Sequence, residues 1–272
     1  MTNKKNKIIY CNGDSFVAGD ELADHEFFDD HPGLLSVSDS NEKKRIAAEW
    51  RRKSCRTRDG ETNRKLRELE RIKAFPNRLQ EITGIPVIND AVGGASFERI
   101  ARTTITSLID LKNEYSEITA IIGLTCPDRF EIPSRHQLRG FDENLPEWDC
   151  INPAWEDLKG QDGRLINLIN YQRIATTKNF RYTRLYLNMI LIKDFCELHN
   201  IRLLWLEAGW HFPEENPGYA SNLREYIDFH SSGNMGTLGH LLDTNALCAD
   251  GHWAEVVHHK FAKELSKYFK DY

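Results

Sequence analysis

An apolar run at residues 118–125, Ile-Thr-Ala-Ile-Ile-Gly-Leu-Thr, constrains the fold more than any other feature of the chain. A run of this length without polar alternation is typical of a strand in a parallel sheet, covered by helices on both faces. Similar short apolar runs occur at residues 7–11, 85–89 and 201–206. Segments with helical periodicity separate these runs. The sequence therefore predicts an α/β protein with a three-layer α/β/α, doubly wound parallel sheet of the flavodoxin-like kind.

The predicted helices lie between these strands. We expect helices over residues 76–83, 182–199 and 254–270, and a further helix after Gly94, where apolar or small residues recur at helical spacing. In doubly wound sheets, the loops at the carboxyl ends of the strands form the active site. The residues that follow each predicted strand are therefore the first candidates for chemistry.

The length of 272 residues suits a single large domain, which we expect to span residues 1–272. Two segments, residues 20–74 and residues 132–180, are longer than a crossover between neighbouring strands requires. We predict that both are insertions at the carboxyl end of the sheet, where long loops are often functional. The first is expected to be a basic helical arm and the second to be lid-like.

The first insertion concentrates positive charge. Residues 42–73 hold thirteen Lys or Arg and six Asp or Glu, a local net charge of +7 in a chain whose net charge is −5. Such a patch could bind an anionic ligand, such as an anionic glycan, a phosphate-bearing substrate or nucleic acid. The alternative is a solvated helical arm, since Glu and Arg intermix over residues 64–73 in a pattern that supports an exposed helix.

Composition argues against several other classes of protein. The six cysteines are scattered without a Cys-x-x-Cys pair, so we expect reduced thiols and no zinc site. We also expect no other metal and no cofactor. No apolar run approaches the roughly 20 residues that a membrane-spanning helix needs. The apolar stretch after the basic N-terminus is too short for a signal peptide. We therefore expect a cytoplasmic protein that does not bind a membrane, and the oligomeric state is left open.

The tripeptide Gly13-Asp14-Ser15 stands just after the first predicted strand. A serine at a strand-to-helix turn would project at the carboxyl edge of the sheet, close to backbone N–H groups that can stabilise an oxyanion. The same position also suits a serine that caps the following helix. The tripeptide alone does not decide between a nucleophile and a cap.

A second tripeptide, Asp250-Gly251-His252, stands before the predicted terminal helix. A histidine there could reach across the carboxyl ends of the strands and take the proton of Ser15, while Asp250 accepts a hydrogen bond from the ring Nδ1–H. In the alternative interpretation, Asp250 caps the helix and His252 lies on the surface. Together, the two tripeptides predict a catalytic triad of Ser15, His252 and Asp250.

A glycine pair follows the second predicted strand, in the segment Asn-Asp-Ala-Val-Gly-Gly-Ala-Ser of residues 89–96. Glycine lets the backbone approach a ligand closely and turn an N–H toward it, as an oxyanion donor must. The alternative is an ordinary strand-to-helix turn in which Ser96 is the N-cap. Both interpretations stay open from this segment alone.

These three motifs, taken in chain order, resemble blocks of the SGNH hydrolase superfamily, also called GDSL esterases or lipases. The resemblance implies that Ser15 is the nucleophile, with His252 and Asp250 as its partners. It also implies that the N–H groups of Ser15 and Gly94 hold the oxyanion. The implied activity is hydrolysis of a short acyl ester, such as an O-acetyl group on a carbohydrate, through an acyl-enzyme.

The third block departs from the family pattern. Where the family has Gly-x-Asn-Asp, whose Asn donates to the oxyanion, residues 123–126 are Gly-Leu-Thr-Cys, with Thr125 in the Asn position. Removing such a donor can cost about a hundredfold or more in rate. We expect the Thr125 hydroxyl or the nearby Arg129 guanidinium to take its place. Arg129 could instead make a structural contact with Asp128 or Glu131.

The last block departs as well, since one residue separates Asp250 from His252 where the commoner family form has two. The pattern Gly-Asp-Ser-Phe-x-x-Gly-Asp-Glu at residues 13–21 looks most like SGNH-type proteins of tailed bacteriophages. That likeness would place the protein in the host cytoplasm or the virion.

We further expect Asp14, Trp210 and His211 to contact the substrate, because each lies close to the end of a predicted strand. Two alternatives to an esterase stay open. A non-catalytic binding or structural protein could retain the fold, and an O-acyltransferase would use the same acyl-enzyme with an acceptor other than water.

Overall fold

The computed structural model describes residues 5–28, 32–57, 60–133, 148–151, 163–207, 219–227 and 252–269. Four parallel strands form one sheet in the order β2-β1-β3-β6. These strands are β1 (Lys5–Asn12), β2 (Val87–Asn89), β3 (Tyr115–Gly123) and β6 (Arg202–Leu206). The apolar run that constrains the fold is β3, which lies inside the sheet between β1 and β6.

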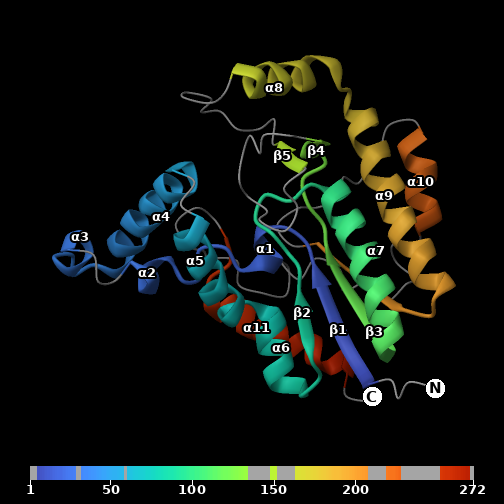
Figure 1. The fold of residues 1–272 in the computed structure, drawn as a ribbon, viewed down its shortest axis with the longest axis horizontal. Coiled ribbons are helices and arrows are strands. Elements are labelled where there is room, and N and C mark those ends of the chain that lie inside the picture. The colour runs from blue at the N-terminus through green and yellow to red at the C-terminus, as the bar shows by residue number, and fades with distance from the viewer. Residues whose placement is uncertain are drawn as a thin grey trace.

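Helices connect the strands and cover the sheet (Figure 1). Before β2, the helices are α1 (Ser15–Ala18), α2 (Asp24–Phe27), α3 (Pro32–Leu35), α4 (Ser40–Thr57), α5 (Gly60–Lys73) and α6 (Phe75–Thr83). After β2, they are α7 (Phe97–Glu114), α8 (Gly163–Ala175), α9 (Lys178–Leu198), α10 (Tyr219–Ile227) and α11 (Glu255–Ser266), which a 3₁₀ turn, η2 (Lys267–Phe269), extends.

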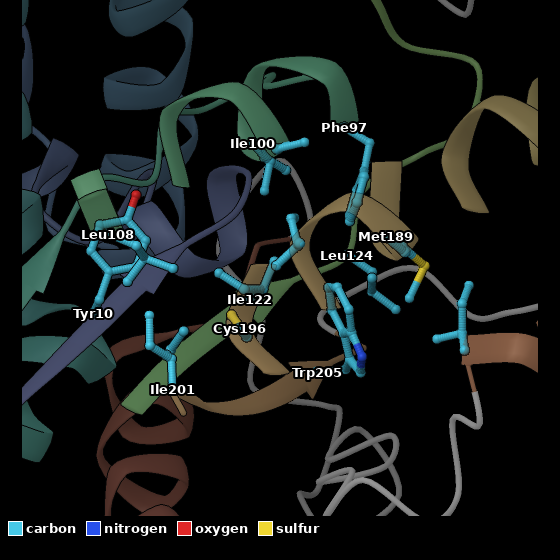
Figure 2. Packing of buried hydrophobic residues seen from close by; sticks show 14 of the residues in the cluster. Tyr10, Phe97, Ile100, Leu108, Ile122, Leu124, Met189, Cys196, Ile201 and Trp205 are labelled. Carbon is cyan, nitrogen blue, oxygen red and sulfur yellow. The ribbon is translucent and has the colours of Figure 1, made fainter. Parts of the chain in front are cut away.

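Two apolar clusters, one on each face of the sheet, make this a three-layer protein. Successive strand residues point to opposite faces, so neighbours in β1 and β3 belong to different clusters. On one face, β1 and β3 pack against α7 and α9, around Tyr10, Ile122 and Trp205 (Figure 2). On the other face, Ile9 and Ile121 pack against α6 and α11. The predicted α/β/α architecture with a parallel sheet is confirmed.

The boundaries differ from the predicted ones by a few residues. The strand predicted at residues 118–125 begins earlier, at Tyr115, and ends at Gly123. A last backbone bond, from the Leu124 N–H to the Leu206 carbonyl at 2.8 Å, joins its end to β6. The helix expected after Gly94 is α7, and its N-cap is Ser96, whose hydroxyl accepts the Arg99 N–H. The capping role considered for Ser96 is thus confirmed.

The first predicted insertion contains α2 to α5, which lie to one side of the sheet in Figure 1. Of the second, the structure describes a two-stranded antiparallel ribbon, β4 (Phe130–Pro133) with β5 (Trp148–Ile151), and α8. The remaining residues of that insertion, 134–147 and 152–162, lie outside the described part of the chain. Among the described helices, none combines the length and the apolar character that crossing a bilayer requires.

Candidate active site

The turns that follow β1 and β2 lie side by side at the carboxyl edge of the sheet. The backbone bonding between the strands continues past the end of β2, where the Asp90 N–H donates to the Cys11 carbonyl at 2.9 Å and the Val92 N–H to the Gly13 carbonyl at 3.3 Å. This pairing brings the turn that contains Gly94 next to the turn that contains Ser15. Two of the three sequence motifs therefore meet in space.

Ser15 is the first residue of α1 and is almost completely buried. The N-cap of this short helix is Asp14, whose Oδ1 accepts the Phe16 N–H at 3.2 Å. The alternative in which Ser15 caps the helix is therefore wrong, because the preceding aspartate fills that position. The Ser15 hydroxyl is not needed to begin the helix.

Asp14 is held from the end of β3 by the two residues that were predicted as oxyanion donors. Its Oδ2 accepts the Thr125 hydroxyl at 3.0 Å and the Arg129 Nη1 at 2.9 Å. Arg129 Nη1 also donates to the Thr125 hydroxyl oxygen at 2.7 Å, and that hydroxyl lies 3.0 Å from the Ala95 carbonyl. We call Asp14, Thr125 and Arg129 the Asp14 clamp.

The Asp14 clamp changes what its members can do. Burial raises the pKa of Asp14, and the Arg129 guanidinium, the Phe16 N–H and the Thr125 hydroxyl oppose that effect without cancelling it. A carboxylate with these partners is satisfied inside the protein, which favours a positioning role for Asp14 over the predicted contact with substrate. The oxyanion roles of Thr125 and Arg129 stay predictions, and both side chains are engaged with Asp14 in this structure.

The ion pairs considered for Arg129, with Asp128 or with Glu131, are wrong. Glu131 forms a bidentate ion pair with Arg102, and Asp128 pairs with Arg181. Arg129 points instead to Asp14. Sequence proximity favoured the neighbouring carboxylates, but β4 carries Glu131 toward α7 and leaves Arg129 beside the site.

His252 lies against the turn that carries Ser15, although the two residues are almost the whole chain apart. Its ring lies 5.2 Å from the ring of Phe16, centroid to centroid, and Phe16 in turn packs edge-on against Trp253. Its Nδ1 lies 3.4 Å from Oε2 of Glu21, a residue of the loop that follows α1. The third sequence motif thus joins the other two at the carboxyl edge of the sheet.

The environment of His252 favours its protonated form. Burial alone would lower its pKa, but the Glu21 carboxylate, with further contributions from Asp20 and Asp14, outweighs the burial and raises the pKa above the ordinary value. When a neutral histidine in this position takes a proton from a hydroxyl, the same carboxylates stabilise the imidazolium that forms. The placement suits the predicted general base.

Gly94 has the backbone conformation that its predicted role requires. Its φ is +78°, in the left-handed region that glycine adopts without strain, and no atom of the described residues lies within 4 Å of the position that a Cβ would occupy. The carbonyl of Gly94 accepts the Cys150 thiol at 2.9 Å, so β5 supports this turn from behind. The space beside Gly94 leaves room for a ligand, and its function as an oxyanion donor stays a prediction.

Three predicted site residues, Asp250, Trp210 and His211, lie outside the described residues. Two residues at the site, Glu21 and Glu70, had no role predicted from the sequence. Glu21 stood in the first motif region, but nothing in a linear pattern indicated that its carboxylate faces His252. Glu70 stood among the charges of the basic arm, where its near-complete burial could not be read from the sequence.

The basic arm is partly neutralised by carboxylates. Among the described side chains of residues 42–73, the ion pairs join Arg45 to Glu42, Arg64 to Glu68, Lys65 to Glu61, Arg67 to Asp20, and Lys73 to both Glu26 and Glu255. The side chains of residues 51–60, where the cations are densest, are not among those described. Binding of an anionic ligand to the arm stays a prediction.

Within the described part of the chain, no three His, Cys, Asp or Glu side chains gather as metal ligands would. Cys11, Cys126, Cys150 and Cys196 are free thiols. Burial raises the pKa of the Cys150 thiol to about 12, so this cysteine is a poor nucleophile at neutral pH. Among the described residues at this edge of the sheet, Ser15 is therefore the strongest candidate for a nucleophile.

No family model matches the sequence, and no curated protein matches it. Three solved structures are similar over nearly all of this chain. One is a protein from Desulfitobacterium hafniense DCB-2 assigned to the G-D-S-L family of lipolytic proteins, at 9% identity and a TM-score of 0.40, covering 97% of this chain and 99% of its own. Another is the psychrotrophic esterase EstA from Pseudoalteromonas sp., at 12% identity and a TM-score of 0.44, covering 98% of each chain.

The third is a carbohydrate esterase whose active site is described as having divergent catalytic and non-catalytic binding functions. It is 12% identical with a TM-score of 0.43, and the alignment covers all of this chain and 70% of that one. The resemblance to bacteriophage proteins has no counterpart among these three and stays a prediction. At such identities and TM-scores the likeness assigns no activity, so the function of this chain depends on what its own residues can do.

Proposed function

We propose that this chain is a serine hydrolase of the SGNH type that cleaves esters through an acyl-enzyme on Ser15. One observation supports this proposal above all others. His252, from the C-terminal end of the chain, lies against the turn after β1 that carries Ser15. Its ring contacts Phe16, the residue after the predicted nucleophile, at 5.2 Å. A buried serine, a histidine and a carboxylate gathered at one edge of a parallel sheet are the parts that acyl transfer requires.

In the proposed reaction, the Ser15 hydroxyl attacks the ester carbonyl while His252 takes its proton. Collapse of the tetrahedral intermediate breaks the bond to the leaving alcohol, which receives that proton. Water then attacks the acyl-enzyme by the same route and releases the acid and free Ser15. The N–H groups of Ser15 and Gly94 are the proposed donors to the oxyanion, since the Asp14 clamp engages the side chains of Thr125 and Arg129.

The proposed substrate is a short acyl ester, such as an O-acetyl group on a carbohydrate. This part of the proposal derives from the family resemblance of the motifs. The open space beside Gly94 is consistent with it, because a glycine there leaves room for the acyl oxygen close to the backbone.

A fluorophosphonate probe and p-nitrophenyl acetate test the proposal directly. The full-length protein is expected to label with the probe and to release p-nitrophenol, and Ser15→Ala is expected to abolish both. Ser116→Ala is a matched control, since Ser116 is exposed at the start of β3, the opposite end from the site. A folded wild-type protein that neither labels nor cleaves the ester would refute the proposal.

One observation favours a second candidate, a non-catalytic binding protein that retains the fold. The family's third oxyanion donor is absent, and Thr125 in its place is bonded to Asp14. A binding protein of this kind would take up an acylated ligand without turnover. Calorimetry beside the cleavage assay separates the two candidates, because a binding protein would bind the ester and leave it intact.

A further inference from the structure

His252 faces a carboxylate that the sequence motifs did not predict. Oε2 of Glu21 lies 3.4 Å from Nδ1 of His252, and the Glu21 side chain is almost completely buried. Within the described part of the chain, the buried Nδ1 has no hydrogen-bond partner, and its contact with Glu21 is at ion-pair distance. We propose that Glu21 is the carboxylate that orients His252 and stabilises its protonated ring during catalysis, in the role predicted for Asp250. This inference rests on the proposed function.

The distance is somewhat longer than a normal N–H···O hydrogen bond of about 2.7–3.2 Å. Catalytic hydrogen bonds are often long without substrate and tighten when substrate binds. The ring nitrogen involved is the informative one. With Nδ1 facing Glu21, Nε2 is the nitrogen left to accept the serine proton, which is the arrangement that a serine–histidine–carboxylate triad uses.

The backbone at Glu21 is strained in a way that suits a functional residue. Its φ is +72°, in the left-handed region that costs a non-glycine residue of order 1 kcal/mol or more. Its N–H donates to Oε1 of Glu70 at 2.7 Å, and Glu70 is buried on α5. The preceding turn is also fixed, because the Asp20 N–H bonds to the Ser15 carbonyl at 3.0 Å. These contacts hold Glu21 in a conformation that it would not adopt alone.

Gly19 shows how closely this turn fits its support. Its φ is +83°, and a Cβ there would come within 2.7 Å of Ala74 and 3.1 Å of the Glu70 carbonyl oxygen. The loop after α1 therefore packs directly on α5 and the start of α6. The end of the first insertion thus supports the loop that places the Glu21 carboxylate at the site. This support does not depend on a ligand of the basic arm.

The other charged groups near His252 already face cationic or neutral partners. Asp14 pairs with Arg129 at 2.9 Å, and Asp20 lies 4.0 Å from Arg67 of α5. On α11, the buried His258 is neutral near pH 7, because burial and the charge of His252 lower its pKa. Among the described carboxylates, Glu21 is thus the one placed to receive the Nδ1–H of His252.

In the proposed step, His252 takes the Ser15 proton on Nε2 as the serine oxygen bonds to the ester carbon. The ring becomes positively charged, and the ionised Glu21 carboxylate stabilises that charge through the Nδ1–H. The proton on Nε2 then passes to the leaving alcohol, and Glu21 remains ionised throughout. No further reactant is needed. Glu21 touches neither substrate nor the reacting atoms, so it is a positioning residue.

The test compares Glu21→Gln with Asp250→Asn in the full-length protein. The specificity constant kcat/KM for p-nitrophenyl acetate is measured as a function of pH, and the titration of His252 is followed by NMR. Glu21→Gln is expected to lower kcat by up to about 10⁴-fold, the loss seen when a triad aspartate is replaced by asparagine. It is also expected to move the acid limb of kcat/KM and the pKa of His252 to lower pH, because a negative charge is lost.

The matched control is Glu26→Gln, since Glu26 is exposed on α2 and pairs with Lys73. It is expected to leave both the pH profile and the His252 titration in place. If Glu21→Gln fails to fold, Glu21→Asn removes the same charge with a residue that tolerates the left-handed conformation. An acid limb and a His252 pKa that shift with Asp250→Asn and stay fixed in the Glu21 variants would overturn the inference.

The NMR titration also keeps this inference separate from the proposed function. A protein without esterase activity would refute the hydrolase, yet the pKa of His252 would still report whether Glu21 is its partner. Conversely, an active protein whose His252 titration ignores Glu21 would retain the hydrolase and refute the pair.

Discussion

Two histidines at the C-terminal end of the chain lie in contrasting surroundings. His252 faces the carboxylates of the β1–α1 region and its pKa is raised. His258, on α11, is buried between α11 and α6, where its Nδ1 accepts the Phe75 N–H at 3.0 Å and burial lowers its pKa to about 3. The same side chain is therefore prepared to exchange a proton in one place and to remain neutral in the other.

The difference teaches what each histidine contributes. The first N–H groups of a helix lack intrahelical partners, and α6 has no side-chain cap at Ala74. His258 supplies the missing acceptor and so ties the two helices on one face of the sheet together. His252 has no such bond and packs against Phe16, the residue after the predicted nucleophile. One histidine stabilises the fold, and the other is the proposed general base.

The largest expected effect separates the two histidines by activity. His252→Ala should lower kcat/KM for p-nitrophenyl acetate by about 10²- to 10⁴-fold, since general base catalysis contributes that much. Any fall in its unfolding midpoint in urea should be smaller than that of His258→Ala, which removes the acceptor of the buried Phe75 N–H. His259→Ala is the control, since His259 is exposed on α11. Wild-type turnover in His252→Ala would contradict the proposed role of His252 as the general base.

A second prediction concerns the Asp14 clamp, whose carboxylate also faces His252. Arg129→Met leaves Asp14 buried without its cation, and losing one partner of a buried ion pair costs about 3–5 kcal/mol of unfolding free energy. The pKa of Asp14, which burial already raises, should rise further because the carboxyl loses its cation. Urea unfolding and NMR titration measure the two effects.

The double variant Asp14→Asn with Arg129→Met checks the cause of that loss. Removing both charges should recover part of the stability, as a double-mutant cycle reports for residues in contact. Additive losses would mean that Arg129 acts through other contacts and that the clamp is not a unit.

The smallest predicted effect is a pH dependence that belongs to His258. Its folded pKa is about 3 and its ordinary value is 6.5, so the unfolded chain binds more protons between these values. The stability that neutral His258 provides is present above about pH 6.5 and is lost as the pH falls toward 3. His258→Gln retains an acceptor for the Phe75 N–H but does not titrate.

This variant should cost about 1–2 kcal/mol at pH 7, through imperfect packing and bonding, and lose less stability than the wild type when the pH is lowered to 5. Urea unfolding at the two pH values gives the difference. His259→Gln should retain the wild-type pH dependence. Equal pH dependence in His258→Gln and the wild type would show that other groups dominate acid unfolding.

Local patterns were sufficient to predict much of the fold. The apolar run of β3 predicted an inner parallel strand, because a strand buried on both faces is apolar at successive positions. The helical spacing after Gly94 predicted α7, because a helix buried on one face has apolar residues at every third or fourth position. The approximate place of Ser15, His252 and Gly94 at the carboxyl edge also followed, since parallel strands end together.

Side-chain partners could not be predicted in this way. Arg129 was expected to act on the oxyanion or on a near neighbour in sequence, and it bonds to Asp14 instead. Glu21 and Glu70 belonged to stretches of mixed charge whose members look equivalent in a sequence. Their burial depends on how α5 packs on the loop after α1, which is a contact between segments far apart in the chain.

The sequence by itself determined that this chain forms a parallel α/β sheet with a serine and a histidine near its carboxyl edge, because hydrophobic periodicity and the residues that follow each strand are local properties. Only the tertiary structure decided which charges meet there. It set Arg129 on Asp14 and Glu21 on His252. The physical reason is that the energy of a charge depends on its burial and on neighbours a few ångströms away, and both arise only when distant segments pack together.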